Sequence, residues 1–118
     1  MELGEFSVSL TVKDMEASLA FYRRLGFEVV DGGHLSREFP DSDEHQWRIV
    51  SNDSTRIGLF QGMFPHNMLT FHPADIEAVR RDLAASGALK SHEAQSHRST
   101  IMLEDPDGNL VMMDGASR

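Results

Sequence analysis

Residues 14–17 read Asp-Met-Glu-Ala, and residues 75–78 read Asp-Ile-Glu-Ala, 61 positions later. Under the same shift Gly26 falls on Gly87. A repeat of this length within 118 residues indicates two copies of one supersecondary unit. We therefore expect a pseudo-twofold molecule in which the two copies enclose something between them.

The elements of each copy follow from local patterns. Residues 6–12 alternate between apolar and hydroxyl side chains, which predicts a strand with one apolar face. Asp14 caps an expected helix over residues 15–25, and Asp75 caps one that runs to residue 86. Gly26 and Gly87 are placed to end these helices. Residues 31–33 predict a turn, residues 105–108 (Asp-Pro-Asp-Gly) a tight hairpin, and further strands are expected over 27–30, 45–50, 55–61, 68–72, 98–104 and 109–114.

Residues 34–43 are polar and are compatible with a strand followed by a loop. A short strand is also expected near Leu89. Each copy then reads β-α-β-β-β, with module 1 over about residues 6–61 and module 2 over about residues 67–115. The expected fold class is α+β. The two tandem modules would form one domain, residues 1–118, with a cupped, barrel-like mixed sheet and helices on its outer face.

Strand parity separates two faces of the predicted sheet. The aliphatic positions, such as Leu10, Leu59 and Ile101, suit packing under the helices. The opposite face is semi-polar and rich in Ser, Thr, Met and Phe, which favours a concave ligand-binding surface. A second core or a dimer interface is the alternative interpretation. The predicted ligand-binding residues are Ser7, Ser9, Trp47, Gly58, Phe60, Gln61, Met68, Thr70, Met102 and Met112.

Composition excludes several function classes. The net charge of −8 argues against binding to nucleic acid or to an anionic membrane, because no basic stripe is present to neutralise phosphates. The absence of cysteine excludes disulfides and thiolate metal sites. The sequence shows no secretory signal and no apolar run that spans a bilayer, so we expect a cytoplasmic protein.

Residues 12–27 (VKDMEASLAFYRRLGF) and 103–111 (LEDPDGNLV) resemble the opening motif and the closing hairpin of vicinal oxygen chelate proteins. This superfamily includes glyoxalase I, bleomycin-resistance proteins, fosfomycin-resistance enzymes and extradiol dioxygenases. The resemblance covers essentially the whole chain and implies paired β-α-β-β-β modules. It also implies a homodimer, and the cup would form within one chain or by exchange of modules between chains.

Enzymes of this superfamily hold a divalent metal with His, Glu or Gln side chains from the first and last strand of each module. Carried over by the resemblance, these positions are occupied by Ser7, Gly58, Met68 and Met112. Serine is a weak neutral ligand, glycine has no side chain, and thioethers do not suit hard cations. The resemblance therefore implies a member without the usual metal site, and no cofactor is expected.

The histidines of the chain offer a different metal chemistry. A displaced metal site built from His45, His66 and His72 is the alternative that would restore catalysis. Residues 61–66 are interpreted either as a linker between the modules or as a flap at the mouth of the cup. The sequence favours a metal-independent protein that sequesters or senses a small, partly apolar molecule. The alternatives are a metal-dependent lyase or dioxygenase, and a structural dimer module whose cup is filled by its own side chains.

Overall fold

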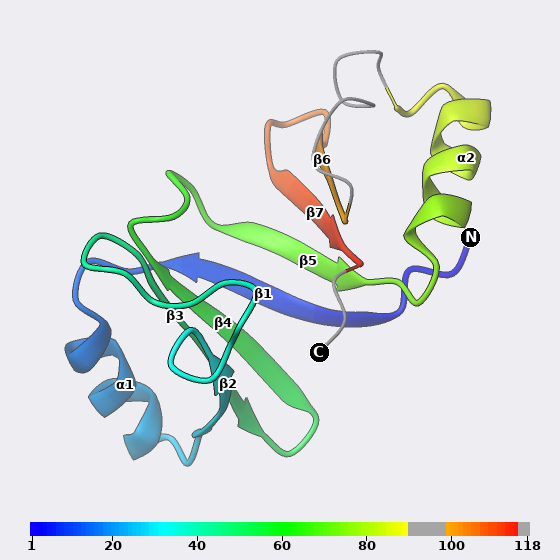
Figure 1. Cartoon of the computed structure of the whole chain (residues 1–118). Helices are drawn as coiled ribbons and strands as arrows, with labels where there is room; N and C mark the ends of the chain where they lie inside the picture. Colours follow the sequence, from blue (N-terminus) through cyan, green and yellow to red (C-terminus); the bar gives the residue numbers. More distant parts are fainter. Residues whose placement is uncertain (90–98, 116–118) are drawn as a thin grey trace. The chain divides into compact units, whose positions relative to one another are not determined.

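The computed structural model describes residues 1–89 and 99–115 (Figure 1). The chain divides into two compact units. We call residues 7–67 the first unit, and residues 1–6 together with the chain from residue 68 onward the second unit. Within the described residues, neither helix is long and apolar enough to cross a membrane.

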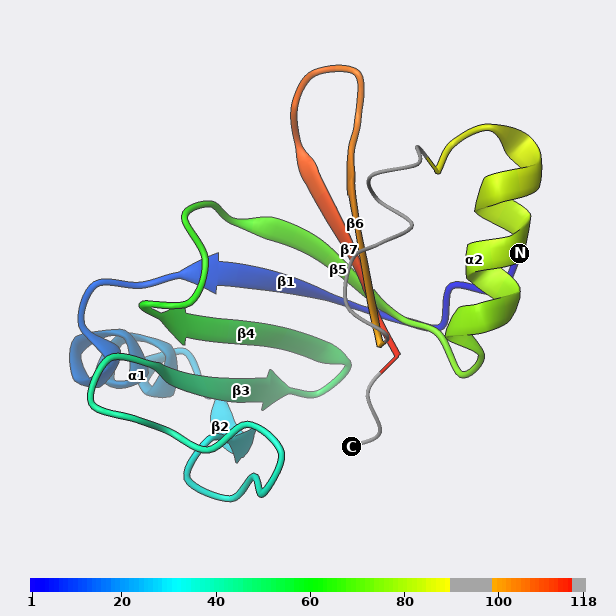
Figure 2. The same ribbon diagram turned by 45° about the horizontal axis from the view of Figure 1, so that its top comes forward.

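The first unit contains one helix and a four-stranded sheet (Figure 2). Its strands occur in the spatial order β2-β3-β4-β1. β1 runs parallel to β4, whereas the β2–β3 and β3–β4 pairs are antiparallel. The elements are β1 (Glu5–Thr11, whose first two residues belong to the second unit), α1 (Met15–Arg24), β2 (Glu28–Gly32), β3 (Gln46–Asn52) and β4 (Thr55–Gln61).

The second unit repeats this pairing with three described strands in the order β5-β7-β6. β5 is parallel to β7, and β6 is antiparallel to β7. The N-terminal residues pack on this unit, since the ring centroids of Phe6 and Phe71 lie 5.3 Å apart. The elements are β5 (Met68–His72), α2 (Ile76–Ser86), β6 (Thr100–Glu104) and β7 (Leu110–Asp114).

The strand registers confirm the sequence repeat. Ser9 pairs with Gly58 in the first unit, and Thr70 pairs with Met112 in the second. Thr70 lies 61 residues after Ser9, which is the shift of the repeat, and Met112 lies 54 residues after Gly58, so the second pair is the counterpart of the first. Within the described residues, the two units therefore correspond in the pairing of their first and last strands.

The predicted helix caps are also confirmed. The side chain of Asp14 accepts a hydrogen bond from the backbone N–H of Ala17 at 3.2 Å, and Asp75 accepts one from Ala78 at 3.0 Å. These bonds satisfy donors that the first helical turn leaves free. Gly87 ends α2 in the left-handed conformation, with φ of 80°.

Each helix buries its apolar stripe on the sheet of its own unit. In the first unit Met15 packs with Val50 and Leu59, and Leu10, Leu19, Tyr22 and other apolar side chains surround them. In the second unit Val79 and Leu83 of α2 pack with Ile101 and Met113. This confirms that the aliphatic face of the strands lies under the helices.

Three expectations need correction. Asp31 and Gly32 belong to β2, which passes through an irregularity between Val29 and Asp31, so the turn begins only at Gly33. No strand occurs between Gly32 and Gln46, because Asp41 ties this segment into a loop through side-chain bonds. Leu89 itself is not in a strand, and the rest of that expected segment, residues 90–98, lies outside the described part of the chain.

Candidate functional site

The helix-free sheet face of the first unit carries the predicted ligand-binding residues of that unit except Gln61. Strand pairing aligns Ser9 with Gly58 and Gly58 with Ile49 in one row, and Phe60 with Trp47 in the next. Ser7 lies two residues before Ser9 in β1, and both serines are buried. Alternation along a strand therefore places all of these residues on one face.

Three aromatic side chains, Trp47, Phe60 and Phe64, form a cluster on this face. Trp47 and Phe60 are stacked, with ring centroids 6.3 Å apart and an interplanar angle of 9°. Phe64, from the segment after β4, meets Phe60 at 5.2 Å and 69°. Phe60 also covers Gly58, because a Cβ built on Gly58 would lie only 2.6 Å from Cε2 of Phe60. The ring thus fills the space that a side chain at position 58 would need.

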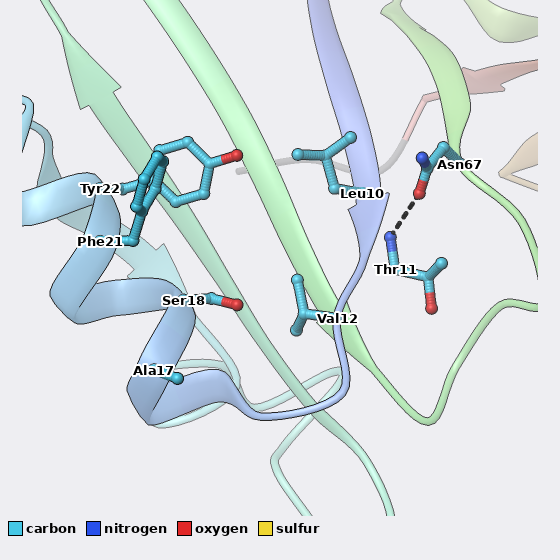
Figure 3. Close-up of a pocket in the computed structure, with 8 residues that line it drawn as sticks. All are labelled: Leu10, Thr11, Val12, Ala17, Ser18, Phe21, Tyr22 and Asn67. Atoms are coloured by element: carbon cyan, nitrogen blue, oxygen red, sulfur yellow. Dashed lines mark hydrogen bonds between the residues drawn. The ribbon is translucent and has the colours of Figure 1, made fainter.

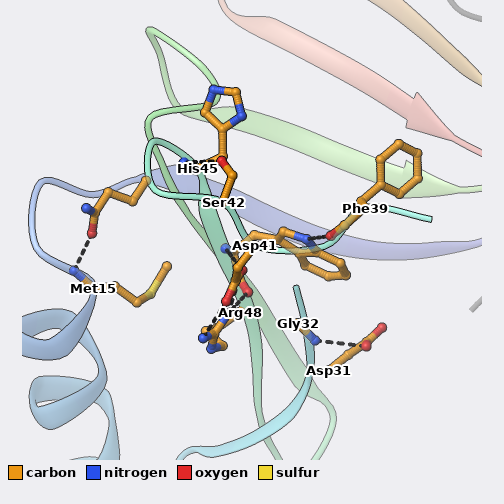
Figure 4. Close-up of polar contacts among 10 residues, drawn as sticks. Met15, Asp31, Gly32, Phe39, Asp41, Ser42, His45 and Arg48 are labelled. Atoms are coloured by element: carbon orange, nitrogen blue, oxygen red, sulfur yellow. Dashed lines mark hydrogen bonds and ion pairs between the residues drawn. The ribbon is translucent and has the colours of Figure 1, made fainter. Parts of the chain in front are cut away.

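Gln61 lies on the opposite face of the sheet, toward α1. Its Oε1 accepts a hydrogen bond from the backbone N–H of Met15 at 2.7 Å (Figure 4). This bond satisfies a free donor at the start of α1 and ties the end of β4 to the helix. The contacts of Gln61 in the structure are those of a residue that positions α1.

The loop over residues 33–45 is fastened to Trp47. The indole Nε1 of Trp47 donates to the carbonyl of Phe39 at 2.7 Å (Figure 4). The backbone carbonyl of Trp47 accepts from the N–H of Gly33 at 3.0 Å. Because the start and the middle of the loop both bond to this one residue, the loop determines the orientation of the indole ring in the aromatic cluster.

An ion pair between Asp41 and Arg48 holds this loop. Arg48 approaches the carboxylate with both terminal nitrogens, at 3.0 Å and 2.8 Å, in the two-pronged geometry that favours this pair. The hydrogen bond from Arg48 lowers the pKa of Asp41 below its ordinary value of 3.8. The sequence interpretation missed this pair, since the acidic stretch of residues 38–44 resembles a solvated loop. The one available indication was an arginine within the apolar strand segment of residues 46–50.

Replacing Asp41 by asparagine is expected to destabilise the protein by about 1–3 kcal/mol near neutral pH, because Arg48 loses a charged partner. Since the folded state lowers the pKa of Asp41, its carboxylate stabilises the fold above the unfolded pKa of 3.8. That contribution disappears as the pH falls through the folded pKa. The difference in unfolding free energy between wild type and Asp41→Asn should therefore shrink between pH 6 and pH 3, measured by urea denaturation.

Asp43→Asn is the matched control for this measurement. Asp43 lies in the same loop with an exposed side chain, and its substitution removes the same formal charge. It should leave the stability of the protein and its pH dependence nearly unchanged. A difference between wild type and Asp41→Asn that stays constant down to pH 3 would contradict the ion-pair interpretation.

The helix-free face of the second unit is lined by methionine and threonine. Pairing aligns Thr70, Met112 and Met102 in one row across the three strands. Met68 lies two residues before Thr70 in β5, and Met68, Thr70 and Met112 are buried. The predicted second-unit residues therefore share a face of their own sheet.

Of the histidines predicted as alternative metal ligands, His72 has a carboxylate partner. Its Nδ1 lies 3.9 Å from Oδ2 of Asp114, and both side chains are largely buried. His45 and His66 are exposed. Within residues 1–89 and 99–115, no group of three or more His, Cys, Asp or Glu side chains is arranged to hold a metal ion.

The residues at the four metal-ligand positions of the resembled enzymes do not fit a hard divalent cation. Those positions carry a buried serine, a glycine and two buried methionines: Ser7, Gly58, Met68 and Met112. Hard cations prefer oxygen and imidazole donors, and thioethers suit soft ones. At Gly58 the mismatch is also steric, because the Phe60 ring occupies the space of a ligand side chain.

Comparison with solved structures identifies proteins of the same fold. A methylmalonyl-CoA epimerase from Mycobacterium tuberculosis has a TM-score of 0.69 at 14% identity, with coverage of 100% of this chain and 93% of that one. The Streptomyces coelicolor methylmalonyl-CoA epimerase, in complex with 2-nitronate-propionyl-CoA, has a TM-score of 0.66 at 18% identity, over 99% and 100%. The hypothetical protein BH1468 from Bacillus halodurans has a TM-score of 0.68 at 11% identity, over 99% and 95%.

A comparison with curated proteins found no match. The family model described as Glyoxalase/Bleomycin resistance protein/Dioxygenase superfamily matches residues 6–113, from β1 to the penultimate residue of β7. The match spans both copies of the repeat. The chain therefore belongs to the Glyoxalase/Bleomycin resistance protein/Dioxygenase superfamily.

Proposed function

We propose that this protein binds a small, partly apolar molecule without a metal ion. The observation that carries the proposal is the ring of Phe60, which lies over Gly58 at a metal-ligand position of the resembled enzymes. Trp47 and Phe64 extend this apolar surface on either side of Phe60. In this proposal an aromatic surface takes the place of a metal-coordinating side chain. The ligand would then be held by removal of its apolar surface from water and not by coordination to a metal ion.

The binding energy would come from the removal of apolar ligand surface from water. Burial of about 150 Å² of such surface contributes about 4 kcal/mol. Trp47 and Phe64 are both partly exposed, so each ring keeps area that a ligand can cover. Stacking on aromatic rings adds geometric preference to this burial. The preferred ligand is a planar or branched apolar molecule.

The second unit presents a softer surface for the same kind of ligand. Methionine side chains are flexible and polarisable, and they adapt to ligands of irregular shape. Met102 is partly exposed, while Met112 and Thr70, which follow it in the same row, are buried. The similar epimerases make methylmalonyl-CoA and 2-nitronate-propionyl-CoA worthwhile members of a ligand screen.

Trp47 is the only tryptophan of the chain and reports directly on the aromatic cluster. The neutral dye N-phenyl-1-naphthylamine should bind saturably and quench Trp47 emission by energy transfer. Phe64→Ala should weaken dye binding about tenfold, equivalent to about 1.4 kcal/mol. Leu25→Ala, which removes an exposed apolar side chain just after α1 in the same unit, is the matched control and should bind the dye as the wild type does.

A ligand present at a free concentration of about 100 times its dissociation constant should also raise the free energy of unfolding by about 2.7 kcal/mol. Equal dye affinity in the wild type and Phe64→Ala would exclude the aromatic cluster as the binding surface.

Metal analysis after purification without chelator tests the competing lyase or dioxygenase function. One tightly held ion per chain that is lost on His72→Ala would overturn the metal-independent proposal.

A further inference from the structure

A pocket of about 390 Å³ opens on the helix side of the first unit, between α1 and the end of β1 (Figure 3). Leu10 and Val12 form its floor, and α1 forms its wall. Leu10 pairs with Leu59, whereas Phe60 and Trp47 lie on the other face of the sheet. The pocket is therefore separate from the aromatic cluster, and it does not depend on the function proposed above.

The pocket exists because α1 carries short side chains along its wall. The large apolar residues Met15 and Leu19 point into the core formed with Val50 and Leu59. Ala17 and Ser18, which have short side chains, line the pocket instead. The helix is thus packed firmly over β3 and β4, and a space remains beside β1.

Polar atoms are placed at the edges of this apolar space. The hydroxyls of Ser18 and Tyr22 point from α1 toward β1 (Figure 3). On the far side Asn67 accepts a hydrogen bond from the backbone N–H of Thr11 at 2.9 Å through its Oδ1. This bond fixes the orientation of the amide and leaves its NH₂ group as a donor. Donors and acceptors therefore lie on both sides of the floor.

The chemistry of the lining identifies the class of ligand. No charged side chain of the described residues lines the pocket, so an ionic ligand would lose hydration without gaining a partner of opposite charge. Phe21 and Tyr22 form an edge-to-face pair at 5.1 Å and 88°, which offers an aromatic rim to a ring-shaped ligand. The volume lies within the range of about 300–1,000 Å³ that is typical of small-molecule sites.

We propose that this pocket is a second binding site, for a neutral, mainly apolar molecule that carries a hydroxyl or carbonyl group. The ring or chain of the ligand would lie on Leu10 and Val12. Its polar group would bond to the Ser18 or Tyr22 hydroxyl. A site with convergent polar groups on an apolar floor discriminates such a molecule from a pure hydrocarbon, because the hydrocarbon leaves those groups without partners.

The test uses 4-methylphenol as the probe and the backbone amide signals of the full chain in an NMR titration. The wild type should show saturable shifts at residues 10–12 and 17–22. Ser18→Leu places an isobutyl group in the pocket and should abolish these shifts. Tyr22→Phe keeps the ring and the fold but removes a hydroxyl, and it should weaken binding about two- to tenfold.

Ala20→Leu is the matched control, because it adds the same side chain at an exposed position of α1 outside the pocket. It should bind the probe as the wild type does. Absence of saturable shifts in the wild type would overturn the proposal, as would unchanged binding by Ser18→Leu and Tyr22→Phe. Shifts confined to Trp47, Phe60 and Phe64 would overturn it too and would place the probe on the aromatic cluster.

Discussion

Replacement of Gly58 by alanine should destabilise the protein by about 1–3 kcal/mol, because the new methyl group meets the ring of Phe60. The Cβ would lie 2.6 Å from Cε2 and 3.2 Å from Cζ of that ring. Phe60 has little room to yield, since Trp47 stacks on it and Phe64 forms a T-shaped pair with it. Urea denaturation of the variant measures the loss, and Trp47 emission should report a displaced ring.

A double-mutant cycle with Phe60→Leu isolates this contact. Leucine removes the ring atoms that the new methyl group would meet, so Gly58→Ala should cost at least about 1 kcal/mol less in the Phe60→Leu background. Additive free energies would show that the cost at position 58 arises elsewhere. The cycle also bears on function, because the same ring displaces a coordinating side chain in the metal-independent proposal.

Gly62→Ala is expected to cost about 2–4 kcal/mol, since two effects add at this position. Gly62 has φ of 76°, a conformation that alanine adopts only with strain. A Cβ there would also collide with the backbone carbonyl oxygen of Glu44. Relief of the collision would move the segment that carries Phe64 away from the loop that carries Asp41, so Trp47 emission should change together with stability.

Gly108→Ala separates the two effects. Gly108 has a similar φ of 85°, but a Cβ there meets nothing within 4 Å. Its replacement should cost only the conformational strain, about 1 kcal/mol. If both variants lost equal stability, the close approach of Gly62 to Glu44 would have no energetic consequence, and residues 61–66 would act as a plain linker.

Local rules sufficed for the architecture. The acidic caps Asp14 and Asp75 and the glycine that ends α2 act within a few residues of their partners, so the sequence alone shows them. Strand alternation separated the faces for the same reason, because parity depends only on position along a strand. The repeat made Thr70 the counterpart of Ser9, and the strand registers agree, since Ser9 pairs with Gly58 and Thr70 with Met112.

The details of the candidate sites depend instead on contacts that sequence patterns do not encode. Asp41 reaches Arg48 only because the intervening loop turns back on itself through the Trp47 hydrogen bond. The Phe60 ring could turn in several directions from β4, and packing against Trp47 and Phe64 selects the one that covers Gly58.

The pocket beside α1 also results from tertiary packing. The sequence determined that α1 is amphipathic and that Leu10 faces it. It did not determine which strands the helix packs against. Packing of Met15 and Leu19 against Val50 and Leu59 places the helix toward β3 and β4 and leaves the short side chains beside β1. Periodicity therefore determined the elements and their buried faces. Tertiary packing decided the ring orientations and the space left open, because it depends on the combined shapes of side chains from distant parts of the chain.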